Sequence, residues 1–213
     1  MNSPAAAVTR EQTLSIFSQV MGLVAVTCGF AALGAYLGRD LNGLIIILPW
    51  LAAFACIIGL NVANRAGRQQ LALVLLFAMG LLLGIAIGYT IKAYATLDPT
   101  VVYQAVGATA LFVAALGTGG YAIRKDLSFL YRFAFIALLA LIVFGIVLFF
   151  VSMPGGSMIY AFLGLALFGL FVVLDFNRLR RAGQQEVIPL AAGIFLTVFN
   201  VFLFFLRIFG GNR

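Results

Sequence analysis

The sequence predicts an all-α membrane protein, a bundle of seven transmembrane helices, on the evidence of its composition and its seven long apolar runs. Hydrophobic residues make up 64% of the 213 residues and charged residues only 9%, whereas soluble domains carry about 25% charged residues. A soluble chain of this length buries only about 70% of its surface, which is too little to shield so many apolar side chains from water. We therefore expect lipid to surround most of the chain.

Each apolar run is long enough to cross the hydrocarbon core as a helix, which takes roughly 20 residues. The predicted spans are residues 15–37, 41–63, 70–92, 101–123, 130–151, 157–177 and 189–209. Because the connections are short, helices adjacent in the sequence are expected to pack antiparallel. The chain then divides into a short cytoplasmic segment (1–14), one transmembrane domain (15–209) and a C-terminal tail (210–213).

The first two spans carry local signals at their start and middle. Thr9 and Gln12 resemble a capping box, so the first helix is expected to begin in water and to run into the bilayer. Its apolar run is too long for the core of a cleavable signal peptide. Pro49 falls in the middle of the second predicted span, where a proline removes one backbone hydrogen bond and acts as a kink or hinge.

Glycine and proline mark the next elements. Gly80, Gly84 and Gly88 form a ridge of small residues on the third span, which predicts close helix–helix approach. Asp98 followed by Pro99 predicts a capped start of the fourth helix.

The last three helices also have predicted starts. Asp126 or Ser128 is expected to cap the fifth helix, and residues 154–156 (Pro-Gly-Gly) separate the fifth helix from the sixth. On the seventh span, five residues that include a threonine, an asparagine and an arginine recur at spacings of four, three, four and three, which places them on one helical face. Because that face is unsuited to lipid, the seventh helix is expected to run through the centre of the bundle. The face consists of Gly193, Thr197, Asn200, Phe204 and Arg207.

The basic residues predict the orientation, because lysine and arginine collect on the cytoplasmic side of membrane proteins. With the N-terminus inside and the C-terminus outside, nine basic residues face the cytoplasm and four face outward. The inner set is Arg10, Arg65, Arg68, Arg124, Lys125, Arg132, Arg178, Arg180 and Arg181, and the outer set is Arg39, Lys92, Arg207 and Arg213.

Asp175 is the one acidic residue that falls inside a predicted span. A charge at the bilayer centre costs about 2.5–3.5 kcal/mol, so an ionisable residue there suggests function. As a functional residue, Asp175 would face the bundle interior and sense protons or cations together with Thr197 and Asn200. Alternatively, Asp175 pairs with Arg178 three residues later and ends the helix, while Thr197 and Asn200 form interhelical hydrogen bonds.

Several classes of protein are disfavoured. The chain has no histidine, the usual ligand of catalytic zinc, and the last span has no lysine to hold retinal. Cys28 and Cys56 lie in apolar runs and are interpreted as small buried hydrophobes rather than a disulfide or metal pair. We expect no catalytic residues, no metal site, no cofactor and no nucleic-acid partner; the bilayer is the predicted partner, and the oligomeric state is left open.

Three segments resemble the Bax inhibitor-1/YccA family. They are AVGATALF (105–112), YAIRKDLSFL (121–130) and FLTVFNVFLFFLRIFG (195–210), and the resemblance is greatest to the bacterial YccA branch. The family implies seven spans and a site in the bacterial inner membrane. Some members are pH-sensitive calcium leaks gated by two aspartates that share a proton. Asp175 matches the first aspartate, whereas Thr197 stands in place of the second and Asn200 matches a nearby asparagine.

The family suggests two functions for the chain. The YccA branch restrains the membrane protease FtsH, and because Thr197 cannot ionise, the leading hypothesis is a modulator of membrane-protein quality control that binds FtsH. The alternative is a pH-sensitive calcium or cation leak with Asp175 as the proton sensor. A purely structural membrane partner is a third, less favoured option.

Overall fold

The chain folds into a helical bundle. The computed structural model describes residues 10–151 and 153–211, with side chains from residue 15 onward. In this part of the chain, seven helices are long and apolar enough to cross a membrane, and there is no strand. They are α1 (Arg10–Leu37), α2 (Ile47–Arg65), α3 (Gln69–Leu97), α4 (Pro99–Ala122), α5 (Leu130–Phe150), α6 (Gly156–Leu179) and α7 (Val187–Gly210). The 3-10 turns η1 (Gly43–Ile46) and η2 (Gln184–Glu186) precede α2 and α7. The predicted fold class is confirmed.

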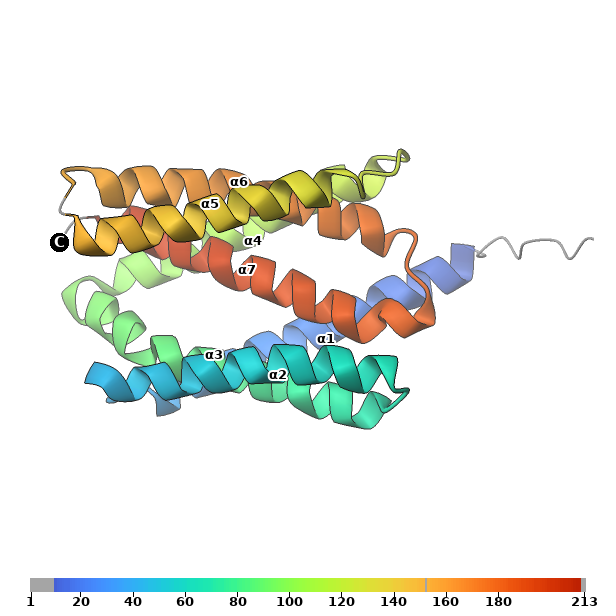
Figure 1. Cartoon of the computed structure of the whole chain (residues 1–213), viewed down its shortest axis with the longest axis horizontal. Helices are drawn as coiled ribbons and strands as arrows, with labels where there is room; N and C mark the ends of the chain where they lie inside the picture. Colours follow the sequence, from blue (N-terminus) through green and yellow to red (C-terminus); the bar gives the residue numbers. More distant parts are fainter. Residues whose placement is uncertain (1–9, 152, 212–213) are drawn as a thin grey trace, which may run out of the picture.

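Helix α7 is the central element. It runs obliquely between two groups of helices, α1–α3 on one side and α4–α6 on the other (Figure 1), and it contacts α1, α2, α3, α4 and α6. Accordingly, 61% of its most apolar stretch is buried, against 11% for α5 at the periphery. The central position predicted from the polar face of the seventh span is therefore confirmed.

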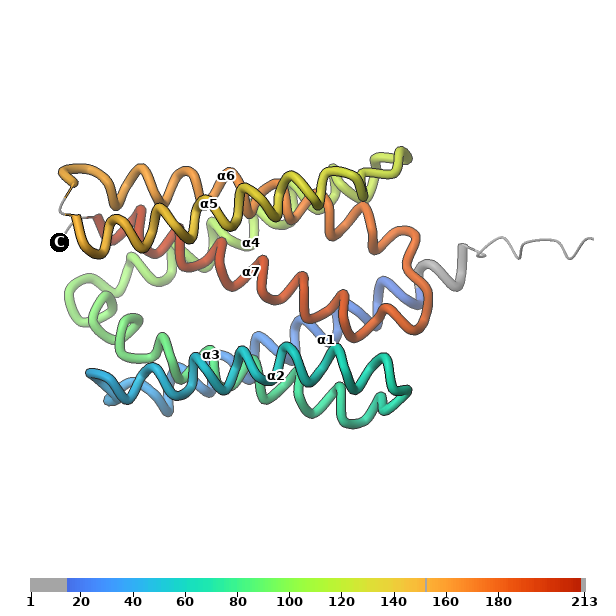
Figure 2. The backbone as a smooth tube through the Cα atoms, viewed as in Figure 1, coloured from blue at the N-terminus to red at the C-terminus, as the bar shows by residue number. Residues whose placement is uncertain are grey.

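The expected packing of sequence neighbours holds for α2–α3, α5–α6 and α6–α7 but is wrong for α1–α2 and α4–α5, which have no extensive contact. α1 and α2 both pack along α3, and α1 runs parallel to α3 (Figure 2). The reason is a set of glycines that removes side chains from the α1–α3 interface. A Cβ at Gly80 would lie 2.8 Å from the carbonyl oxygen of Thr27, and a Cβ at Gly88 would lie 2.7 Å from the carbonyl carbon of Gly38. Backbones therefore approach directly, as in other small-residue membrane interfaces.

The starts of α4 and α6 carry the residues that the sequence predicts there. Asp98 is the N-cap of α4 and accepts a hydrogen bond from the amide of Thr100 at 3.0 Å, with Pro99 as the first helical residue. Gly155 has a φ of 73°, a left-handed conformation that suits glycine, immediately before α6 begins at Gly156.

Two other local predictions are wrong. Phe129, rather than Asp126 or Ser128, precedes the first residue of α5, and it provides no side-chain cap. Asp126 instead accepts the Ser128 amide at 2.8 Å and stabilises the loop itself. Pro49 lies in the first turn of α2, because η1 occupies the preceding residues. Pro49 therefore lies near the start of the second span rather than at its middle, and its role as a hinge stays a prediction.

The connections gather at the two ends of the bundle. The start of α1 lies at the same end as the α2–α3, α4–α5 and α6–α7 connections (Figure 1). This is the end that the distribution of basic residues predicts to be cytoplasmic, and the orientation stays a prediction. Residues 1–9, which include Thr9 of the predicted capping box, and residues 212–213 of the predicted tail lie outside the described residues.

Candidate functional site

Asp175 on α6 forms the centre of a buried polar cluster. Its side chain is only 7% exposed. Oδ1 accepts a hydrogen bond from the hydroxyl of Tyr131 on α5 at 2.8 Å, and Oδ2 accepts one from the hydroxyl of Thr197 on α7 at 2.9 Å. A buried carboxylate needs such partners to offset the loss of hydration. The three residues therefore join α5, α6 and α7 inside the bundle.

Helix packing positions these three side chains. Asp175 lies on the face of α6 that also buries Val172 and Leu179, and this face is directed at α7. Thr197 is 6% exposed on the opposing surface of α7. Tyr131 is the second residue of α5, and its ring packs against Phe171 with centroids 6.5 Å apart. The hydroxyl thus reaches Asp175 from a helix that otherwise lies at the edge of the bundle.

Tyr131 was not predicted as part of this site. The available signal was its position at the predicted inner end of the fifth span, the same end at which Asp175 lies in the sixth. Because the hydroxyl of a buried tyrosine needs a hydrogen-bond partner, a nearby buried carboxylate was a candidate acceptor.

Arg178 and Asn200 do not join the cluster. The guanidinium of Arg178 binds the carboxylate of Glu186, with Nη2 and Nε at 2.7 and 3.1 Å from Oε1. The alternative in which Asp175 pairs with Arg178 is therefore wrong, because the end of α6 brings Arg178 to Glu186 in the α6–α7 connection. Asn200 donates to the carbonyl oxygen of Leu196 in its own helix at 2.8 Å.

A second polar network, also not predicted, surrounds Asn177 at the end of α6. Asn177 is 2% exposed. Its Nδ2 donates to the carbonyl oxygens of Ile123 at 2.8 Å and Lys125 at 3.1 Å, and its Oδ1 accepts from the amide of Leu127 at 3.2 Å. One asparagine therefore satisfies three backbone groups of the α4–α5 loop.

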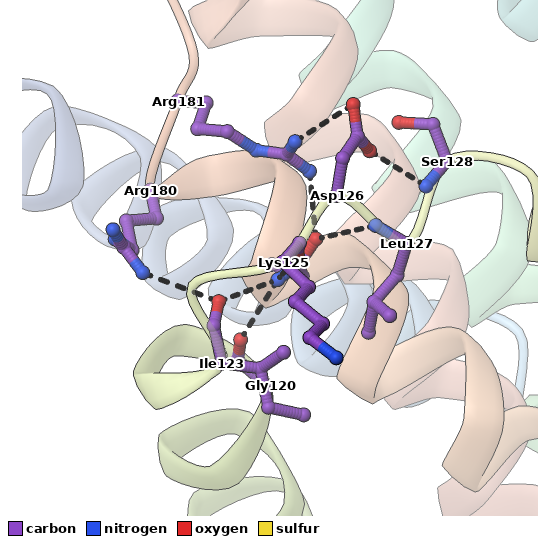
Figure 3. A network of polar contacts seen from close by, with 9 residues as sticks. Gly120, Ile123, Lys125, Asp126, Leu127, Ser128, Arg180 and Arg181 are labelled. Atoms are coloured by element: carbon purple, nitrogen blue, oxygen red, sulfur yellow. Dashed lines mark hydrogen bonds and ion pairs between the residues drawn. The ribbon is translucent and has the colours of Figure 1, made fainter.

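Two arginines complete this network (Figure 3). Arg181 donates to Oδ1 of Asn177 at 2.7 Å and forms an ion pair with Asp126 at 2.8 Å, and Arg180 donates to the carbonyl oxygen of Ile123 at 3.2 Å. We name residues 123–128 the latched loop, because the last turn of α6 holds it at several points. The latched loop lies within residues 121–130, one of the three segments that resemble the Bax inhibitor-1/YccA family.

The ion pair of the latched loop predicts a pH effect. Hydrogen bonds from Ser128 and Arg181 lower the pKa of Asp126 from 3.8 to about 2. Because the folded pKa is depressed, the stabilisation is complete above pH 3.8 and is lost as the pH falls through about 2. Asp126→Asn should therefore lower the melting temperature at neutral pH, and this difference from the wild type should shrink between these two values. Thermal unfolding in detergent measures it, and equal melting temperatures at neutral pH would contradict the prediction.

The chemistry of the Asp175 cluster suits a proton better than a resident metal. It offers one carboxylate and two hydroxyls, whereas calcium sites use six to eight oxygen ligands. Within residues 10–151 and 153–211, no three histidine, cysteine or acidic residues are placed to hold a metal ion.

Comparisons with known proteins identify the family. Residues 13–213 match the family model described as inhibitor of apoptosis-promoting Bax1. An uncharacterized membrane protein of Vibrio cholerae is 27% identical over 195 residues, covering 90% of this chain and 85% of its own length. An uncharacterized membrane protein of Streptococcus pyogenes serotype M1 is 26% identical over 214 residues, covering 92% of each chain. Because the family model spans nearly the whole sequence, this membrane protein belongs to the Bax inhibitor-1 family.

Proposed function

We propose that the protein is a proton-responsive cation leak of the bacterial inner membrane, with Asp175 as its proton sensor and calcium as a candidate ion. The supporting observation is the burial of Asp175 between hydroxyls from α5 and α7. A carboxylate in water at the end of the bundle would instead have supported a helix-ending ion pair. This geometry favours the cation leak over the FtsH modulator, which is the leading hypothesis from the sequence alone.

Protonation changes what Asp175 can bind. As a carboxylate it accepts from Tyr131 and from Thr197. The protonated acid carries a donor of its own, so one of the two hydroxyls must turn and accept instead. The other titratable or charged groups that act on Asp175 are Tyr131 from α5 and Arg178 from α6. Because α7 contacts five other helices, a shift at Thr197 would be transmitted to much of the bundle.

Calcium flux in proteoliposomes tests the leak. We expect the wild-type flux to change between pH 5 and pH 8, and Asp175→Asn to abolish this change because an amide takes up no proton in that range. Thr197→Val should keep the pH dependence. Because it removes one hydrogen bond to Asp175, it should shift the equilibrium between the protonated and the ionised form of Asp175 by about 1 kcal/mol, roughly fivefold.

Asp126→Asn is the matched control. It also removes a carboxylate, but Asp126 has a pKa of about 2 and lies outside the interior, so the flux should keep its pH dependence. A flux that is flat across this range in both the wild type and Asp175→Asn would refute the leak.

The second candidate is an FtsH modulator, and the latched loop favours it. The network around Asn177 holds this loop in one conformation at the predicted cytoplasmic end, while the side chains of Arg124 and Lys125 are exposed. A rigid, exposed basic surface suits recognition of a partner protein, since little conformational freedom is lost on binding.

Co-isolation with FtsH tests the second candidate. The wild type should co-isolate with the protease, and deletion of the protein should alter the turnover of FtsH substrates. Replacement of Arg124 and Lys125 by glutamate should reduce co-isolation, whereas Arg68→Glu, an exposed residue on the α2–α3 connection, should not. Failure of co-isolation together with unchanged turnover would exclude this function.

A further inference from the structure

A pocket of about 890 Å³ lies between α1, α3, α4 and α7, away from the Asp175 cluster. Ala31, Ala32 and Ala35 of α1 form one wall, and Phe199 and Phe202 of α7 form another. The pocket exists because α1 is drawn onto α3 by glycines whereas α4 packs against α6 and α7. The small alanines of α1 then leave the space between α1 and α4 unfilled.

The interior of the pocket offers little to a polar ligand. Its walls are mostly aliphatic and aromatic, and the polar residue well inside it is Thr109 on α4, which is 5% exposed. The Thr109 hydroxyl already donates to the carbonyl oxygen of Ala105 at 2.7 Å. Water is stable in a cavity only with two to four polar partners. An apolar chain therefore suits this interior better than water or a polar solute.

The mouth of the pocket is charged. Lys92 on α3 binds Asp40 with Nζ 2.6 Å from Oδ1, and Arg39 binds the other oxygen of Asp40 at 3.4 Å. Two cations thus share one carboxylate, which leaves a net positive charge. Both basic side chains are about half exposed, at 52% for Lys92 and 47% for Arg39. The Arg39 guanidinium also lies over the Tyr36 ring, with its central carbon 4.2 Å from the ring centroid. The exposed part of each basic side chain still offers N–H donors to an anion.

The position of the pocket along the helices relates its charged mouth to its apolar interior. Arg39 follows the end of α1 and Lys92 lies near the end of α3, at the level where basic side chains reach lipid headgroups. The apolar volume extends from there along α1 and α7. A cationic mouth that leads into an apolar interior matches a lipid, in which a phosphate group is followed by an acyl chain.

We propose that this pocket binds one anionic phospholipid, with an acyl chain between α1 and α4 and the phosphate against Arg39 and Lys92. Volumes of 300–1,000 Å³ are typical of ligand sites. The net positive charge distinguishes an anionic headgroup from a zwitterionic one, so the site should prefer phosphatidylglycerol to phosphatidylcholine.

Native mass spectrometry of the full chain in detergent tests the proposal with these two lipids. The wild type should retain one phosphatidylglycerol at least tenfold more strongly than phosphatidylcholine. Ala32→Phe, which places a ring in the pocket, should abolish retention, whereas Ala137→Phe on the exposed face of α5 should not. Replacing Arg39 and Lys92 by glutamine removes two charged hydrogen-bond partners, each worth roughly tenfold or more, so the retention of phosphatidylglycerol should weaken by more than about tenfold and the preference should disappear.

Cys28 gives a second readout that does not depend on a variant in the pocket. It lines the pocket, whereas Cys56 lies on α2, so a Cys56→Ala background reports on Cys28 alone. Phosphatidylglycerol should slow the reaction of Cys28 with an apolar maleimide, and phosphatidylcholine should not. The proposal is overturned by retention of detergent alone, by equal retention of both lipids in the wild type, or by undiminished retention in Ala32→Phe.

Discussion

Gly84→Ala is expected to lower the free energy of unfolding by about 2–3 kcal/mol, the cost of overpacking a tight interior. A Cβ at this position would overlap the carbonyl oxygen of Ala31 and lie 2.9 Å from its Cα. These are backbone atoms, which cannot rotate away, so α1 must move as a unit. Such a shift would also disturb the contacts of Gly80 and Gly88 on the same ridge. Unfolding in mixed micelles with increasing denaturing detergent measures the change.

Gly29→Ala provides the matched control for this prediction. It introduces the same methyl group on α1, where no atom lies within 4 Å of the added Cβ. We expect its stability to stay equal or to rise by up to about 1 kcal/mol, because alanine favours helix more than glycine does. If Gly84→Ala were as stable as Gly29→Ala, the close approach of α1 to α3 would be disproved.

The sequence predicted the spans well because lipid imposes a strong constraint on length and composition. The observed helices α4, α5 and α6 begin within two residues of their predicted spans. The central position of α7 was also predictable, since Thr197 and Asn200 share a face unsuited to lipid. Which helices pair was not predictable in the same way, because it depends on backbone contacts between residues as far apart as Ala31 and Gly84.

The candidate site was predictable only in part. Asp175 stood out because a carboxylate inside an apolar run is costly, and Thr197 followed from the face of the seventh span. Tyr131 and Asn177 are neutral residues near span ends, where polar groups are common and many partners are within reach. Their roles arise only once α5 and the latched loop fold onto α6. Pro49 was misplaced for a related reason, since the 3-10 turn before α2 leaves no pattern in hydropathy.

Asn177→Leu is expected to destabilise the protein by about 3 kcal/mol and to release the latched loop. Leucine has a similar size but cannot replace the hydrogen bonds to the carbonyl oxygens of Ile123 and Lys125 or to the amide of Leu127. Each buried polar group left without a partner costs about 1–3 kcal/mol, and water that enters the loop recovers part of this. Thermal unfolding measures the stability, and amide hydrogen exchange of residues 123–128 should accelerate.

Asn61→Leu separates this effect from the general loss of an asparagine. Asn61 lies on an exposed face of α2, and its Nδ2 donates a hydrogen bond to the carbonyl oxygen of Ile57 in the same helix at 2.8 Å. Its replacement should therefore change the free energy of unfolding by less than about 1 kcal/mol. If the latched loop is the surface that binds FtsH, Asn177→Leu should also weaken co-isolation while leaving the pH dependence of calcium flux intact, because Asp175 keeps its partners on α5 and α7. Unchanged exchange of residues 123–128 in Asn177→Leu would mean that the arginines alone hold the loop.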